Sequence, residues 1–178
     1  MRAVVCDALG EPLAVREIDD PPAPGAGQVR LRVRAAGVNF PDLLMVKGQY
    51  QEKPPLPFVP GMECAGTVID CGDGVTGFAP GDRVMASLDH GGFAGAALAD
   101  AARVYRMPDA MSFETAAGFG VVYQSAWIGL VPRSRLKAGE TLLVLGAAGG
   151  IGLAAVEIGK AMGATVIAAA SNAGKLAV

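Results

Sequence analysis

The residues with the clearest chemical potential are a run of small side chains near the end of the sequence. Residues 146–152 read GAAGGIG and lie between the apolar run TLLVL and the helical pattern LAAVEIGKAM. Glycine lets a backbone turn sharply and approach a ligand, and the free N–H groups and dipole at a helix start attract negative charge. This turn therefore predicts a diphosphate site, with a glycine-rich packing turn as the alternative.

Such a site needs a strand, a turn, a helix and a second strand in that order. Residues 141–145 form a continuous apolar run, residues 150–162 have helical spacing, and residues 164–170 form a second apolar run. This order predicts one βαβ unit of a dinucleotide-binding fold. The cofactor contacts are expected from Ala147, Ala148, Gly149, Gly150, Ile151 and Gly152.

The end of the second strand indicates which nicotinamide cofactor is bound. A free ribose 2′-hydroxyl is usually held there by Asp or Glu, whereas this chain has Ala170, Ser171 and Asn172. A hydroxyl and a cation suit a 2′-phosphate, so Ser171 and Lys175 predict NADPH. The alternative is that Ser171 caps a helix beginning at Asn172 and that Lys175 is a solvated charge.

Residues 1–110 follow another pattern, in which short apolar runs are broken by Gly and Pro. Val29, Leu31 and Val33 alternate with arginines, which is the period of a strand with one exposed face. The proline cluster at residues 54–60 predicts a rigid loop leading into the next strand. We therefore expect a mostly β domain here.

Residues 111–178 change to helices and buried strands. Ser112 is placed to cap a helix, although Gly118 and Gly120 weaken that helix. A complete dinucleotide fold needs about six parallel strands, and this segment has only the first two. We therefore expect an incomplete nucleotide-binding domain and a fragment of a longer enzyme.

The composition narrows the possible partners. Hydrophobic residues make up 52% of the chain and charged residues 18%, so the chain can bury a core. A formal net charge of −2 gives no broad positive surface for nucleic acid or an anionic membrane. The most apolar segment carries Glu157 and Lys160, which argues against a membrane span. Three cysteines without metal-type spacing and the absence of a signal-peptide pattern indicate the cytoplasm.

Several motifs together resemble the medium-chain dehydrogenase/reductase superfamily. They are AAGVNFPDLLMVKGQY at 35–50, PFVPGMECAGTV at 57–68, GDRV at 81–84 and AAGGIG at 147–152, and they are similar to the zinc-independent NADPH:quinone oxidoreductases of the ζ-crystallin type. The resemblance implies a chaperonin-10-like (GroES-like) β domain followed by a Rossmann domain, with the active site in the cleft between them. It also implies a homodimer for full-length proteins.

The resemblance also bears on metal binding. Zinc-dependent relatives have a Cys where this chain has Asn39 and a His where it has Met62. Neither replacement supplies the ligands that catalytic zinc needs, and Cys64 and Cys71 lack neighbours to complete a structural zinc site, so no metal is expected. The hydride acceptor should then carry its own electron sink, as a quinone or an α,β-unsaturated carbonyl does.

The reaction implied is hydride transfer from NADPH to such an acceptor. Asn39 and Tyr50 would line the substrate side, with the final proton coming from water or Tyr50. Tyr123 is expected to approach the cofactor, although Val122 stands where many relatives have Thr. Two other functions stay open, namely an inactive fragment that acts as a binding module and an enoyl-thioester reductase.

Structural alternatives accompany these residues. Asn39 could hydrogen-bond its own backbone in a turn, and Tyr50 could be only an amphipathic loop residue. Asp42 is expected to cap a short helix rather than to act as an acid or base. Glu63 is interpreted as a structural polar anchor, and His90, the only histidine, as a solvated loop residue.

Overall fold

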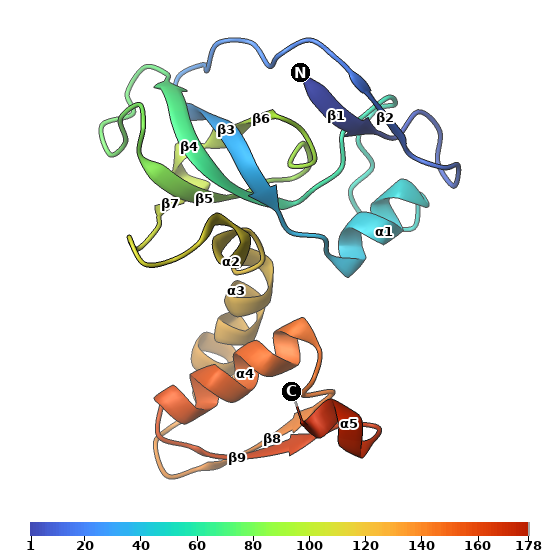
Figure 1. The fold of residues 1–178 in the computed structure, drawn as a ribbon. Helices are drawn as coiled ribbons and strands as arrows, with labels where there is room; N and C mark the ends of the chain where they lie inside the picture. Colours follow the sequence, from blue (N-terminus) through green and yellow to red (C-terminus); the bar gives the residue numbers. More distant parts are fainter. Residues whose placement is uncertain (178) are drawn as a thin grey trace. The chain divides into compact units, whose positions relative to one another are not determined.

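The computed structural model describes residues 1–177. The chain folds into two compact units (Figure 1). Unit 1 is Met1–Gly120 and unit 2 is Val121–Val178. Unit 1 is mostly β and unit 2 contains a βαβ arrangement, so the fold class predicted from the sequence is confirmed.

The secondary structure of unit 1 is two antiparallel sheets with short helices between their strands. Its strands are β1 (Arg2–Val5), β2 (Ala14–Glu17), β3 (Gln28–Ala36), β4 (Glu63–Cys71), β5 (Arg83–Ser87), β6 (Ala96–Asp100) and β7 (Val104–Arg106). Its helices are α1 (Phe40–Val46), the 3₁₀ turn η1 (Ala101–Arg103) and α2 (Phe113–Ala117). β1 pairs with β2, and the larger sheet has the order β6-β3-β4-β5-β7.

The core of unit 1 lies against the larger sheet. Val29 and Leu31 on β3 are completely buried, as their alternation with arginines predicts. Arg30, on the opposite face, makes a bidentate pair with Asp70 of β4 at 2.6 and 2.9 Å. Each fully buried Val or Leu side chain contributes about 1.5–3 kcal/mol, so this alternation fixes which face of β3 is inside.

The proline-rich segment is an irregular loop between α1 and β4, as predicted. Phe58 in this loop is buried and packs against Cys6 and Met45. Its backbone exchanges hydrogen bonds with Cys6 at 2.8 and 3.1 Å. This contact fixes the loop immediately before β4 begins at Glu63.

Unit 2 is built around one parallel strand pair. Its elements are α3 (Gly120–Ile128), whose first residue belongs to unit 1, the π-helical turn η2 (Gly129–Arg133), β8 (Thr141–Leu145), α4 (Gly150–Ala161), β9 (Thr165–Ala169) and α5 (Ala173–Leu176). β8 and β9 are parallel, with Leu143 beside Ile167. α4 packs on the side of this sheet that carries Leu142 and Val166, close to Gly159.

The helix expected after Ser112 is two helices. Ser112 does cap α2, because its Oγ accepts the N–H of Thr115 at 3.1 Å. α2 has Gly118 as its C-cap and α3 starts at Gly120, which reflects the low helix propensity of glycine. Ala116 and Ala117 of α2 are buried against the unit 1 sheet, so α2 belongs to unit 1, although the sequence interpretation placed it in the second domain.

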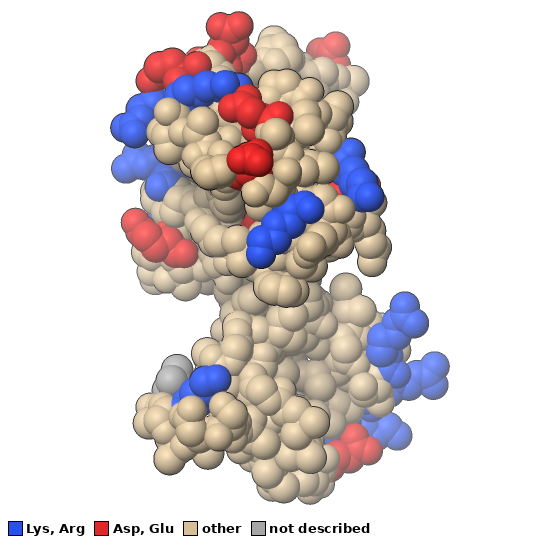
Figure 2. All heavy atoms as spheres, turned by 90° about the vertical axis from the view of Figure 1, so that its right-hand side faces the viewer, with Lys and Arg blue, Asp and Glu red and all other residues tan. Residues whose placement is uncertain are grey.

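The surface carries both signs of charge. Figure 2 shows Lys, Arg, Asp and Glu side chains interspersed over unit 1 on the face in view. Among the helices of residues 1–177, none combines the length and apolarity that crossing a membrane requires.

Candidate functional site

The glycine-rich turn of unit 2 connects β8 to α4. Gly146 has φ +67°, which a side-chain-bearing residue adopts only with strain. A Cβ added to Gly152 would lie 2.3 Å from the carbonyl oxygen of Gly146, so only glycine allows the first turn of α4 to approach the preceding turn this closely. Both glycines are therefore needed for the shape of the turn.

The backbone N–H groups of this turn fall into two sets. The N–H of Ala147 donates to Ala169 of β9 and that of Gly149 donates to Gly146, each at 3.0 Å. These two groups hold the turn together. The N–H groups of residues 150–152 belong to the first turn of α4 and have no acceptor within their own helix. They are the groups that an anion would meet.

A pocket of about 660 Å³ opens beside this turn. Its lining is made of small and apolar residues with one hydroxyl and one cation, namely Leu145, Gly146, Ala148, Gly149, Ala169, Ala170, Ser171 and Lys175. The structure thus brings the predicted 2′-phosphate residues, Ser171 and Lys175, to the same pocket as the turn.

The capping alternative for Ser171 is wrong. The N-cap of α5 is Asn172, whose side-chain oxygen accepts the N–H of Lys175 at 3.0 Å. Asn172 can be the cap because its extended backbone turns its short side chain back over the helix start. Ser171 instead lines the pocket.

The residues at this pocket fit a dinucleotide. The close approach at Gly152, the N–H groups at the start of α4 and the lysine that lines the pocket with Ser171 are groups that could hold phosphate groups of such a ligand. Ala147 is buried and its N–H is used by β9, so its contribution to such a site is to shape the turn.

Tyr123 and Val122 connect α3 to α4. The Tyr123 hydroxyl donates a hydrogen bond to Glu157, and this bond raises the pKa of the tyrosine above its usual value. A Cβ on Gly150 would lie 2.8 Å from a methyl carbon of Val122. α3 therefore packs tightly on the beginning and middle of α4, which supports the turn.

A polar cluster in unit 1 surrounds the start of α1. Asn39 is the N-cap of this helix, and its backbone N–H donates to Asp42 Oδ2 at 2.8 Å. The side-chain Nδ2 of Asn39 donates to Glu63 Oε1, also at 2.8 Å. Asp42 and Glu63 are each only 2% exposed. The helix begins at Phe40 and is capped by Asn39, so the prediction that Asp42 is the cap is corrected.

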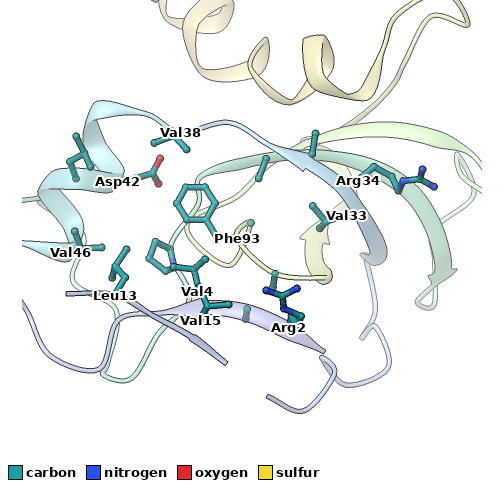
Figure 3. Close-up of a pocket in the computed structure, with 17 residues that line it drawn as sticks. Arg2, Val4, Leu13, Val15, Val33, Arg34, Val38, Asp42, Val46 and Phe93 are labelled. Carbon is teal, nitrogen blue, oxygen red and sulfur yellow. The ribbon is translucent and has the colours of Figure 1, made fainter. Parts of the chain in front are cut away.

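The second carboxylate oxygen of Asp42 has no hydrogen bond within the described chain. Burial raises the pKa of Asp42, and the backbone N–H groups of Asn39, Gly61 and Met62 oppose this rise. Asp42 lines a mostly apolar pocket of about 680 Å³, and Figure 3 shows its carboxylate directed toward the ring of Phe93.

The other predicted residues of unit 1 lie elsewhere. Tyr50 and Met62 are half-buried and pack against the cluster of Cys6, Met45 and Phe58. His90 is exposed in its loop, with its ring 6.1 Å from that of Phe58. Residues 1–177 contain no group of three or more His, Cys, Asp or Glu side chains arranged to hold a metal ion.

Sequence reasoning missed the environment of Asn39. The spacing Asn-x-x-Asp is a capping-box signal, and it could have placed the helix start at Asn39. No local pattern indicates the contact between Asn39 and Glu63, because these residues are 24 positions apart. The tertiary fold alone brings them together.

Comparison with known proteins gives consistent matches. Residues 25–109 match the alcohol dehydrogenase GroES-like domain. The chain is 42% identical over 170 residues to the quinone oxidoreductase-like protein 2 homolog of Nematostella vectensis, covering 94% of this chain and 47% of that protein. It is 39% identical over 175 residues to the human quinone oxidoreductase, covering 97% of this chain and 53% of that protein.

A solved structure agrees with these relatives. The quinone oxidoreductase of Thermus thermophilus, whose structures include a complex with NADPH, superposes with a TM-score of 0.83 at 39% sequence identity. The match covers 98% of this chain and 55% of that one. The chain thus spans about half the length of the curated relatives it matches.

Proposed function

Because this chain belongs to the medium-chain dehydrogenase/reductase superfamily, among its quinone oxidoreductase-like members, we propose that it serves NADPH-dependent reduction of a quinone or an α,β-unsaturated carbonyl. The observation that carries the proposal is the pocket beside the glycine-rich turn, where Ser171 and Lys175 stand in place of a carboxylate. A carboxylate there would repel a 2′-phosphate, whereas a lysine attracts it.

The residues of unit 2 would hold the cofactor. The N–H groups of residues 150–152 would donate to the diphosphate, and the dipole of α4 would favour its negative charge. Ser171 and Lys175 would bind the 2′-phosphate, while Val122 and Tyr123 keep α4 in place. Bound NADPH would supply the hydride.

The residues of unit 1 would serve the substrate. Asn39 would donate a hydrogen bond to the carbonyl oxygen of the substrate that accepts the hydride. Water or Tyr50 would supply the proton that completes the reduction. Zinc is not part of this proposal, because Asn39 and Met62 occupy positions where zinc-dependent relatives have ligands and the Asn39 amide is engaged with Glu63. The conjugated acceptor would instead spread the developing charge itself.

Cofactor binding tests the first half of the proposal. We expect the purified chain to bind NADPH more tightly than NADH in calorimetric or fluorescence titrations. Lys175→Glu should remove that preference, with a loss of at least about tenfold in NADPH affinity because a charge-assisted bond becomes a repulsion. The control is Lys160→Glu on α4, outside the residues that line the pocket.

Two results would contradict this half. Equal affinity for NADPH and NADH would remove the role of Ser171 and Lys175. Absence of any nucleotide binding would favour the alternative in which the chain is an inactive binding module.

Turnover tests the second half. NADPH oxidation should be seen with a quinone or an enone and should be slower with an enoyl thioester. A clear preference for the thioester would instead assign the chain to the enoyl-thioester reductases.

A further inference from the structure

We propose that Glu63 is a positioning residue that fixes which way the side-chain amide of Asn39 faces, and that the remaining amide N–H donates to the carbonyl oxygen of the hydride acceptor. The inference rests on the proposed function, because it assumes that Asn39 meets the substrate. It adds the atom that would make the contact and the residue that orients that atom.

The hydrogen bond between the two side chains decides the amide orientation. Asn39 Nδ2 lies 2.8 Å from Glu63 Oε1, and Glu63 is only 2% exposed. Glu63 Oε1 accepts this hydrogen bond, so the group of Asn39 that faces it is the NH₂ group. The Oδ1 atom of Asn39 must then lie on the other side of the amide.

The main chain of Asn39 is held as well. Its backbone N–H donates to Asp42 Oδ2 at 2.8 Å, and the residue is the N-cap of α1. Two buried carboxylates, one on α1 and one on β4, therefore hold Asn39 at its backbone and at its side chain. The backbone contact fixes the position of the residue, and only one of the two amide orientations lets Nδ2 donate to Glu63.

The carboxylate of Glu63 is itself closely surrounded. A Cβ on Gly37 would lie 2.4 Å from Glu63 Oε1, and a Cβ on Gly120 would lie 3.1 Å from Oε2. The same Gly120 position is 3.5 Å from Ser87 Oγ on the neighbouring strand. Glycine at both positions leaves just enough space for the carboxylate, so Glu63 keeps a fixed place from which to orient Asn39.

This arrangement leaves one N–H group of Asn39 for a ligand. Nδ2 carries two hydrogens, one of which goes to Glu63, and Nδ2 donates no second hydrogen bond within residues 1–177. Asn39 is only half-buried, so that hydrogen can reach a ligand. When a hydride adds to a conjugated carbonyl, the π electron pair moves to the oxygen, and an N–H donor there stabilises the developing charge. Bound NADPH would supply the hydride and be oxidised, and water or Tyr50 would supply the proton.

Three variants separate positioning from mere packing. Glu63→Gln keeps the size but both donates and accepts, so Asn39 can face either way, and we expect kcat to fall about tenfold with a smaller change in KM. Asn39→Asp places two carboxylates together and should destabilise the chain. The double variant N39D/E63Q restores one hydrogen bond in the reverse direction, with the introduced glutamine as the donor, but offers the substrate no N–H.

The double variant gives the decisive comparison. We expect its melting temperature to recover toward that of the wild type while kcat stays low. A double variant that recovers both stability and kcat would show that the contact is only structural and would overturn the proposal. Asp70→Asn is the matched control, because it makes the same acid-to-amide change on β4 and should leave kcat unchanged.

A spectroscopic measurement tests the orientation without turnover. The sequence has only two asparagines, Asn39 and Asn172, so the NH₂ resonances of Asn39 are identified by their loss in Asn39→Asp. They should shift in Glu63→Gln and stay in place in Asp70→Asn. Unshifted resonances in Glu63→Gln would overturn the proposal. If the resonances shift in Glu63→Gln as expected but the wild-type chain shows no turnover, the proposed function is contradicted instead.

Discussion

The protonation of Asp42 should affect folding. Its carboxylate is buried, and burial raises its pKa above the ordinary value of 3.8. The folded chain therefore holds this proton more tightly than the unfolded chain does. The favourable contribution of Asp42 to stability is fully present below pH 3.8 and is lost as the pH rises through the raised pKa.

We predict that Asp42→Asn changes this pH dependence. The free energy of unfolding of the wild type, relative to that of the variant, should fall as the pH rises from about 3.5 to about 7, because only the wild type must bury a charge. Urea unfolding of both proteins across this range is the measurement. A difference that does not vary with pH would show that Asp42 titrates alike in the folded and unfolded chains.

The cysteines differ in reactivity. Cys64 is buried, and burial, with the nearby charge of Glu63, raises its pKa to about 12. Cys6 is also buried, whereas Cys71 is partly exposed. We predict that iodoacetamide at neutral pH modifies Cys71 first and leaves Cys64 intact, because the thiolate is the reactive form. Mass mapping of the native chain, with the urea-unfolded chain as control, checks this order, and early modification of Cys64 would contradict it.

At the residue scale, candidate functional residues could be identified from the sequence, but the residues that they contact could not. Asn39 and Lys175 stood out because their chemistry differs from that of the residues usually found at such positions. The contact between Asn39 and Glu63 could not be predicted, since it depends on how β4 lies beside the start of α1. The use of the Ala147 N–H by β9 was equally invisible, because it depends on strand pairing.

At the element scale, local patterns predicted the structure well. The βαβ order of unit 2 was readable because apolar runs and helical spacing are local signals. The break between α2 and α3 was harder to predict, because glycine weakens a helix without fixing where it ends. The assignment of α2 to unit 1 depends on Ala116 and Ala117 packing under the sheet, which no local signal records.

The β8–α4 turn gives an element-scale prediction. Gly152→Ala should lower the stability of unit 2 by about 1–3 kcal/mol and weaken NADPH binding, because the added Cβ meets the Gly146 carbonyl oxygen. Gly129→Ala is the matched control, since nothing lies within 4 Å of its added Cβ. Urea unfolding followed through the only tryptophan, Trp127 of α3, reports on this unit. Equal effects of the two substitutions would contradict the role assigned to Gly152.

At the scale of the whole molecule, the two units have unequal cores. Unit 1 has a five-stranded sheet with several completely buried side chains, such as Val29, Leu31 and Val84. In unit 2 the β8–β9 sheet leaves Leu143 56%, Leu145 75% and Ile167 51% exposed. The buried hydrophobic residues of unit 2 in the described part of the chain are one leucine, one valine and three alanines, so unit 2 should be the less stable unit.

We predict two unfolding transitions. Trp127 fluorescence should report unfolding of unit 2 at a lower temperature than circular dichroism reports for the sheet of unit 1. Saturating NADPH should raise only the midpoint temperature of the first transition. At a ligand concentration about 100 times Kd, binding should stabilise unit 2 by about 2.7 kcal/mol. NADH at the same concentration is the control. Coincident transitions with both probes would mean that the two units unfold together.

The exposed face formed by Leu143, Leu145 and Ile167 also affects how the chain fares in a cell. Chaperones and proteases recognise hydrophobic surface of this kind, and small losses of stability can change protein abundance several-fold. The lifetime of each newly synthesised chain should therefore depend on how quickly this face is shielded from the quality-control machinery. A charged side chain at position 143, which is outside the residues that line the pocket beside the glycine-rich turn, would lengthen that lifetime without changing the pocket.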